Sequence, residues 1–131
     1  MVDAGERSQP RILLVEDEAL IALDMQDILE EAGYAVVGPA DRVGSALALA
    51  ESEMLDAALL DVNLDGEKVW PVAEALRKRD IPFVLLTGSP SGQEQSPGTV
   101  RAPQLSKPVQ QPALLEAISA VLREAERRKK P

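Results

Sequence analysis

The sequence contains no cysteine and no histidine among its 131 residues. Without cysteine, the chain can form neither disulfides nor a thiolate metal site. Without histidine, it lacks the imidazole used in general acid–base catalysis and in histidine–zinc sites. Ligands for a metal ion must therefore come from oxygen atoms.

Aromatic residues and positive charge are also scarce. One Trp, one Tyr and one Phe are present, so the core must be built from Val, Leu, Ile and Ala. The net charge of −8 argues against nucleic acid, because phosphate backbones select Lys and Arg. No segment approaches the roughly 20 apolar residues of a membrane span, and residues 1–10 lack the apolar run of a signal peptide. We expect a soluble, cytoplasmic protein that binds neither nucleic acid nor membranes.

Apolar runs alternate with segments of helical periodicity. Residues 12–15, 34–37, 57–60 and 83–86 are continuous runs typical of buried strands, and Gly38-Pro39 closes the second. A short fifth strand is expected to end at Leu105. Helical spacing is shown by Ile21, Met25, Ile28 and Ala32, by Val43, Ala46, Leu47 and Ala50, by Val69, Val72, Ala73 and Leu76, and by Leu114, Leu115, Ile118, Val121, Leu122 and Ala125.

This alternation predicts one α/β domain, a parallel sheet with helices on both faces. Gly33 stands where the first helix should be capped. We place a flexible leader at residues 1–10, the domain at 11–126 and a charged tail at 127–131. Residues 89–103 contain three prolines, two glycines and no apolar stripe. They predict a mobile loop in which a further helix is short or absent.

Charged and polar residues follow the predicted strands. Glu16 and Asp17 come after the first, Asp61 after the third, Thr87 after the fourth and Lys107 after the fifth. Ligand sites of open α/β sheets lie at the carboxyl ends of the strands, so we expect these side chains to converge. Each also has a purely structural interpretation: Asp17 can cap a helix, Thr87 suits a strand and Lys107 can be an ordinary loop residue.

Taken together, these residues indicate a particular chemistry. Clustered carboxylates repel one another unless a cation lies between them, and ligands that are all oxygen favour Mg²⁺. A carboxylate can attack phosphorus to give an aspartyl phosphate. Such a transfer depends on positioning and on neutralising charge, which Mg²⁺ and Lys107 would provide.

The same residues resemble the motifs of response-regulator (CheY-like) receiver domains between about Arg11 and Arg123. The motifs are residues 12–18, residues 59–64, Thr87-Gly88 and Lys107-Pro108. The resemblance implies a flavodoxin-like, doubly wound, five-stranded parallel sheet in the order 2-1-3-4-5. It also implies that the Lys107–Pro108 peptide bond is often cis.

The resemblance further implies the roles of the site residues. Asp61 would be the phosphoacceptor, and Thr87 and Lys107 would contact the phosphoryl group. Mg²⁺ would be bound by Asp17 and Asp61 directly, by Glu16 through water and by the backbone carbonyl of Asn63. Many receivers carry an aromatic switch residue three positions before the lysine, where this sequence has Gln104.

The implied protein is a single-domain response regulator of two-component signalling. It would accept a phosphoryl group from a histidine kinase or phosphotransfer protein and signal to a downstream protein. It would be no enzyme beyond self-catalysed phosphotransfer and dephosphorylation. Residues 66–72, Pro82-Phe83 and residues 86–88 resemble those of single-domain receivers that partner histidine kinases of the HWE type.

Three alternatives compete with this interpretation. A receiver-like module could bind partners without being phosphorylated, although the set Asp17, Asp61, Thr87 and Lys107 is complete. A hydrolase of the haloacid dehalogenase type would carry Asp-x-Asp after the first strand, where this chain has Glu16-Asp17-Glu18. A flavin carrier would need a phosphate-binding loop there, and an acidic triplet would repel phosphate.

Overall fold

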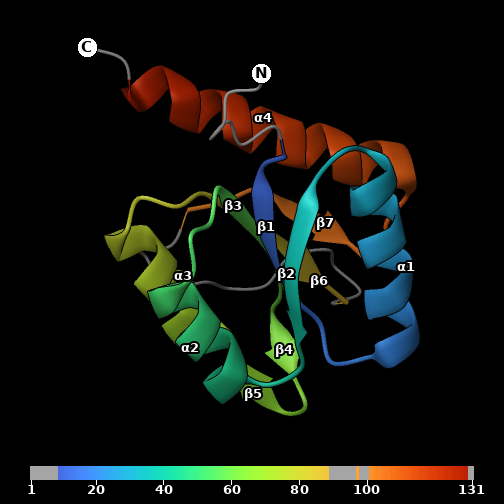
Figure 1. Ribbon diagram of the computed structural model, residues 1–131. Coiled ribbons are helices and arrows are strands. Elements are labelled where there is room, and N and C mark those ends of the chain that lie inside the picture. Colours follow the sequence, from blue (N-terminus) through green and yellow to red (C-terminus); the bar gives the residue numbers. More distant parts are fainter. Residues whose placement is uncertain (1–8, 89–96, 98–100, 130–131) are drawn as a thin grey trace.

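A parallel sheet of five strands forms the centre of the computed structural model, which describes residues 9–88, 97 and 101–129. The strand order is β2-β1-β3-β6-β7, the order 2-1-3-4-5 that we predicted (Figure 1). The strands are β1 (Arg11–Val15), β2 (Ala35–Ala40), β3 (Ala57–Asp61), β6 (Phe83–Thr87) and β7 (Gln104–Ser106).

Helices cover both faces of this sheet, which confirms the doubly wound α/β fold. They are α1 (Ala19–Glu31), α2 (Val43–Ser52), α3 (Trp70–Lys78) and α4 (Gln111–Lys129). Helices α1 and α4 lie on one face, and α2 and α3 lie on the other (Figure 1). None of the helices in the described ranges combines the length and apolarity that a bilayer crossing requires.

The core is aliphatic, as the scarcity of aromatic residues predicts. Every residue of β3 and β6 is buried, and the largest fully buried side chains are all Leu or Ile. Each such side chain stabilises the fold by about 1.5–3 kcal/mol through burial. Because β1, β3 and β6 are covered on both sides, their carboxyl ends are held rigidly at one edge of the sheet.

Strand β2 is longer than its sequence predicts. The expectation that Gly38-Pro39 closes it was wrong, since the strand continues to Ala40. Gly38 has φ +100, and the register against β1 shifts between Leu13 and Val15, so the pair forms an irregularity inside the strand. Pro39 is tolerated because β2 is an edge strand, where a missing N–H costs little. The Gly38–Pro39 peptide bond is cis.

Helix α1 packs largely as predicted, but it is rotated slightly. Met25 is buried and Ile21 and Ile28 pack half-buried against the core, as expected, whereas Ala32 is exposed at the C-cap. The most deeply buried residues also include Ala22 and Leu29, each one position after a predicted residue. Gly33 follows the C-cap with φ +99, which confirms its predicted role.

Residues 63–68 form a small hairpin of β4 (Asn63–Leu64) and β5 (Glu67–Lys68). Its two-residue turn, Asp65-Gly66, has positive φ at both positions (48 and 89), as tight Asp-Gly hairpin turns require. The hairpin follows β3 directly and so lies beside the carboxyl edge of the sheet.

The C-terminal boundary also differs from the prediction. Helix α4 continues through Lys129, so the charged tail expected from residue 127 begins inside the helix. Its basic residues lie in the last turn, where the helix dipole favours cations. Residues 89–96 and 98–100 lie outside the described residues, as does most of the leader, so the predicted mobile loop stays a prediction. Residues 101–103 are described and are not helical.

Candidate functional site

The predicted site residues meet at the carboxyl edge of the sheet. Asp61 and Thr87 are the last residues of β3 and β6, Glu16 follows β1 and Lys107 follows β7. These four strands are neighbours in the order β1-β3-β6-β7, so their ends form one continuous edge. The point where the chain order reverses, between β1 and β3, is where open α/β sheets bind ligands.

Lys107 is the centre of this cluster. Its ammonium Nζ lies 3.0 Å from Asp61 Oδ2 and 3.0 Å from Glu16 Oε1. The backbone N–H of Lys107 donates to the carbonyl of Thr87 (2.9 Å), which ties the end of β7 to the end of β6. The Lys107–Pro108 peptide bond is cis, as the resemblance implied. Lys107 therefore joins residues that are 46 and 91 positions away in the sequence.

Three carboxylates lie together at this point. Oxygen atoms of Glu16, Asp17 and Asp61 lie within 4.8 Å of one another. Glu16 and Asp61 are buried, and Asp17 is half-buried. Asp17 Oδ2 accepts a hydrogen bond from the Asp65 N–H (2.8 Å), which attaches the β4–β5 hairpin to the site.

Burial and like charge act on the protonation of Asp61. The pKa of Asp61 is raised from 3.8 to about 7, mainly by burial and also by the charges of Glu16 and Asp17, while the hydrogen bond and the charge of Lys107 oppose the shift. Burial by itself lowers the pKa of Lys107, but hydrogen bonds to Asp61 and Glu16 outweigh it, so the Lys107 pKa is raised. The ammonium therefore stays charged while the carboxylates compete for it.

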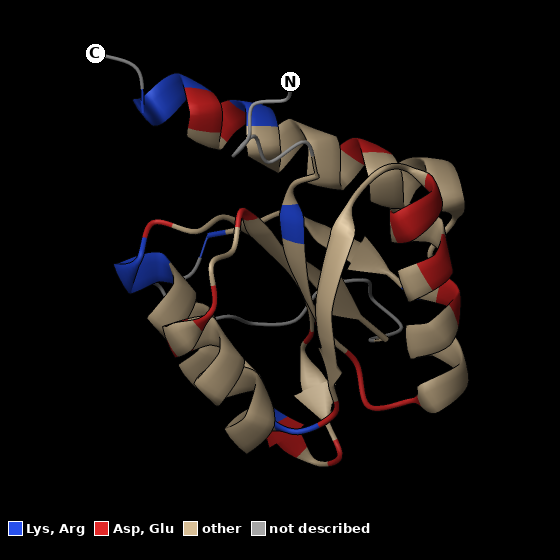
Figure 2. Ribbon diagram, in the orientation of Figure 1, with Lys and Arg blue, Asp and Glu red and all other residues tan. Residues whose placement is uncertain are grey.

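The cluster suits a divalent cation. One ammonium faces three carboxylates, which leaves negative charge unbalanced in a partly buried place. Glu16 Oε1 is buried, and its one partner among the described residues is the Lys107 ammonium, whose hydrogen bond goes to Glu16 Oε2 instead. An oxygen-only set of this kind fits Mg²⁺, which prefers carboxylate and carbonyl ligands. Figure 2 shows acidic segments along the loop after β1 and in the hairpin, with a short basic stretch beside them, and further basic segments at the ends of α3 and α4.

Two of the predicted residues are placed less directly. Thr87 is fully buried beside this edge, one position beyond the Asp61–Leu86 pair in the sheet register. Asn63 is exposed, and its side-chain Oδ1 accepts a hydrogen bond from Lys68 Nζ (2.7 Å). Neither Lys68 nor the Asp65 backbone was predicted to contact the site residues. The Asp65-Gly66 dipeptide is a hairpin signal, however, and it would have placed Lys68 opposite Asn63.

Residues 12–119 match the model of the response regulator receiver domain. The chain belongs to this family. It is similar to the transcriptional regulatory protein PdtaR of Mycobacterium tuberculosis, with 39% identity over 88 residues, 65% of this chain and 42% of PdtaR. It is also similar to PilH of Pseudomonas aeruginosa, with 30% identity over 118 residues, 86% of this chain and 97% of PilH.

Solved receivers share the fold. The solution structure of SdrG from Sphingomonas melonis Fr1 is 46% identical, with a TM-score of 0.75 over 88% of this chain and 98% of SdrG. This receiver spans less than half the length of PdtaR but nearly all of PilH and SdrG. Membership assigns the domain to two-component regulation, and receivers are not enzymes of the usual kind that turn over a separate substrate.

Proposed function

We propose that this receiver is a single-domain response regulator that accepts a phosphoryl group on Asp61. The observation that carries the proposal is the contact of Lys107 with both Asp61 and Glu16 at the carboxyl edge of the sheet. The high coverage of PilH and SdrG supports a regulator of this size.

The reaction follows from the chemistry of a carboxylate. An Oδ atom of Asp61 attacks the phosphorus of a phosphohistidine, the new O–P bond forms, and the P–N bond to the donor imidazole breaks. The proton that the leaving imidazole takes up comes from solvent. Lys107 lies where its ammonium can neutralise a phosphoryl oxygen, and the Thr87 hydroxyl is proposed to contact another. The protein's part is to place charge around the transferring group.

Asp17 and Asp61 are proposed to hold Mg²⁺ directly, with Glu16 acting through water and Asn63 through its backbone carbonyl. When bound, the ion would neutralise charge on the phosphoryl oxygens. Support comes from the clustering of the three carboxylates around a single ammonium group. The Asn63 side chain is occupied by Lys68, which is compatible with a role for the Asn63 main chain alone.

The proposed donor is a histidine kinase, of the HWE type on the resemblance of Pro82-Phe83 and Thr87-Gly88, or a phosphotransfer protein. Output is proposed to pass to another protein in the cytoplasm. The second candidate function is a receiver-like module that binds partners without phosphorylation.

Acetyl phosphate labelling separates these two functions. With Mg²⁺, intact mass should rise by one phosphoryl group, and Asp61→Asn should abolish the gain. Asp17→Asn should weaken Mg²⁺ binding by about tenfold in calorimetry, since one charged ligand is lost. Asp41→Asn, an acidic side chain outside the trio, serves as the control. An unlabelled wild type, or labelling that survives in Asp61→Asn, would favour the binding module.

A further inference from the structure

A groove lies at the opposite end of the sheet from Asp61, where β6 begins. It has a cavity volume of about 490 Å³ and is lined by α3, α4 and the chain before β7. Its floor is apolar and includes Ile81, Phe83 and Val121. We call it the arginine groove, after Arg77, Arg101 and Arg128, which also line it.

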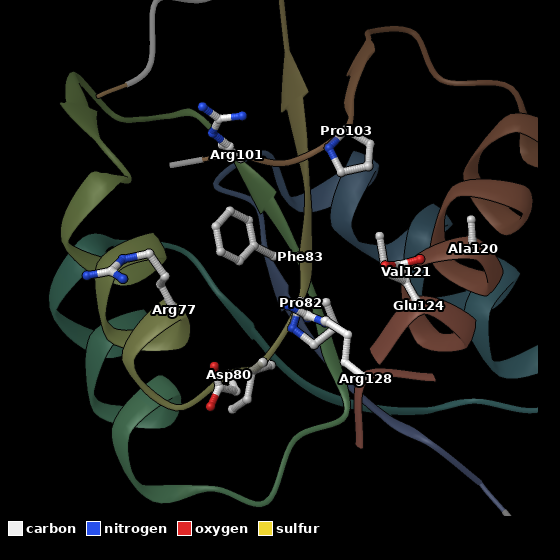
Figure 3. Close-up of a pocket in the computed structure, with 11 residues that line it drawn as sticks. Arg77, Asp80, Pro82, Phe83, Arg101, Pro103, Ala120, Val121, Glu124 and Arg128 are labelled. Carbon is white, nitrogen blue, oxygen red and sulfur yellow. The ribbon is translucent and has the colours of Figure 1, made fainter. Parts of the chain in front are cut away.

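Figure 3 shows how these side chains are arranged. The ring of Phe83 lies in the middle, with Arg77 and Arg101 on one side and Val121 on the other. Arg128 lies near Pro82 at the lower rim. The groove therefore offers an apolar centre within a rim of guanidinium groups, which suits an anionic ligand that also carries an apolar side chain.

The charge of the groove contrasts with that of the whole chain. The chain carries −8, but the lining holds three arginines against two acids, Asp80 and Glu124. Glu124 is already paired with Arg127. Arg101 and Arg128 form no ion pair with any residue in the described ranges. As far as the described ranges show, these two guanidinium groups can bind a ligand's carboxylates in bidentate geometry.

The positions of the arginines favour a particular ligand shape. The chain before β7 runs along the start of β6, since the Leu85 N–H donates to the Pro103 carbonyl (2.9 Å), and it places Arg101 on one side of Phe83. Arg128 lies on the opposite side (Figure 3). A ligand that reaches both guanidinium groups must extend across Phe83, which suits an extended peptide better than a compact small molecule.

We propose that the arginine groove binds an extended acidic segment of a partner protein, with one apolar side chain against Phe83 and carboxylates on Arg101 and Arg128. The groove is distant from Lys107 and the acidic trio, so this inference does not rest on phosphorylation. Residues 101–103 lead directly into β7. Just after β7, the backbone N–H of Lys107 donates a hydrogen bond to the Thr87 carbonyl.

Fluorescence anisotropy with the full chain tests the proposal. The probe is a fluorescein-labelled synthetic peptide with four glutamates around one phenylalanine, at an ionic strength near 0.15 M so that the overall negative charge is screened. Wild-type protein should bind it, and Arg101→Glu and Arg128→Glu should each weaken binding by about tenfold or more, the loss expected for one charge-assisted hydrogen bond. A peptide with glutamine in place of glutamate should bind the wild-type protein as weakly as the glutamate peptide binds these variants.

Arg123→Glu is the matched control, because Arg123 is on the same helix as Arg128 but does not line the groove. It should leave binding within about twofold, and circular dichroism should show all three variants folded. Equal losses in all three variants would overturn the proposal, since they would mean binding by overall charge. Absence of binding would overturn it, as would tighter binding of a single-stranded oligonucleotide than of the peptide. Asp61→Asn should bind the probe normally whether or not Asp61 is phosphorylated in the wild type.

Discussion

Lys107 Nζ lies 3.0 Å from Asp61 Oδ2, although Lys107 follows β7 and Asp61 ends β3, two strands that are separated by β6. Both side chains reach the same point because parallel strands end at one edge of the sheet. The ammonium lies on the carboxylate that is proposed to be phosphorylated, and the same ammonium contacts Glu16.

Removal of this ammonium should slow phosphorylation. Lys107→Met keeps much of the side-chain volume but removes the charge, and we expect the rate of acetyl phosphate labelling to fall by about tenfold to a hundredfold, as when one stabilising donor is lost. Lys68→Met is the control, because the Lys68 ammonium donates to the side chain of Asn63. Equal rates in wild type and Lys107→Met would exclude the proposed role of Lys107.

The pH dependence of stability should reveal the buried Asp61. Its pKa is raised from 3.8 to about 7 in the folded protein, so between these values the folded state holds a proton that the unfolded state has released. The contribution of Asp61 to stability is therefore greatest at low pH and is lost as pH rises through this window. In Asp61→Asn an amide replaces the carboxyl group, so the folded state has no titrating proton at this position and this pH dependence is lost.

Urea unfolding in the presence of EDTA measures this difference. The free energy of unfolding of Asp61→Asn, relative to wild type, should be higher at about pH 7.5 than at about pH 5. Mg²⁺ should reduce the loss of wild-type stability at the higher pH, because it neutralises the carboxylates. A difference between the two proteins that does not change with pH would contradict the raised pKa.

Exposed leucines on α1 should contribute to kinase recognition, by analogy with the family. Leu20 is 82% exposed and Leu23 is 55% exposed, both on the helix that follows Asp17. Leu20→Ser and Leu23→Ser should each slow phosphotransfer from the cognate kinase by about tenfold, the effect of losing an apolar interface contact. Labelling by acetyl phosphate should not change, because small donors need no docking surface.

The cognate kinase is identified first as the kinase that phosphorylates the wild type fastest in a phosphotransfer profile. Met54→Ser provides the control, since Met54 is also exposed (67%) but lies between α2 and β3. If both leucine variants accepted the phosphoryl group at the wild-type rate, the kinase would not dock on this surface of α1.

Gly38 should be intolerant of a side chain. Its φ is +100, and a Cβ there would lie 2.8 Å from Ala40 N and 2.9 Å from Leu14 O, both backbone atoms. Gly38→Ala should lower the free energy of unfolding by at least about 1–3 kcal/mol from backbone strain alone. Gly44→Ala, in α2 with open space around it, should instead raise stability by about 0.5 kcal/mol. Thermal melts of both variants test the contrast.

Much of the fold followed from local patterns. The runs at residues 12–15, 57–60 and 83–86 are apolar throughout because their strands are buried on both faces, and such continuity can be recognised without coordinates. The positions of Asp61 and Lys107 at strand ends followed from the same reasoning, because a parallel sheet brings its carboxyl ends together.

Other features depended on contacts between distant segments. The buried face of α1 was predicted only in part, because Ile21 and Ala22 are both apolar and only packing against the sheet decided which is the more deeply buried. The Gly38-Pro39 pair looks like a strand end, but β2 continues past it, and the register against β1 shifts at this point. Neither outcome is encoded in a window of a few residues.

By itself the sequence determined the parallel α/β sheet and the set of acidic, hydroxyl and amine groups at its carboxyl edge, since periodicity and strand ends are local properties. Only the tertiary structure decided that Lys107 contacts Glu16 as well as Asp61, and that Arg77, Arg101 and Arg128 line one groove. Those contacts join residues far apart in the chain, and their distances depend on how the helices and strands pack, which no local pattern specifies.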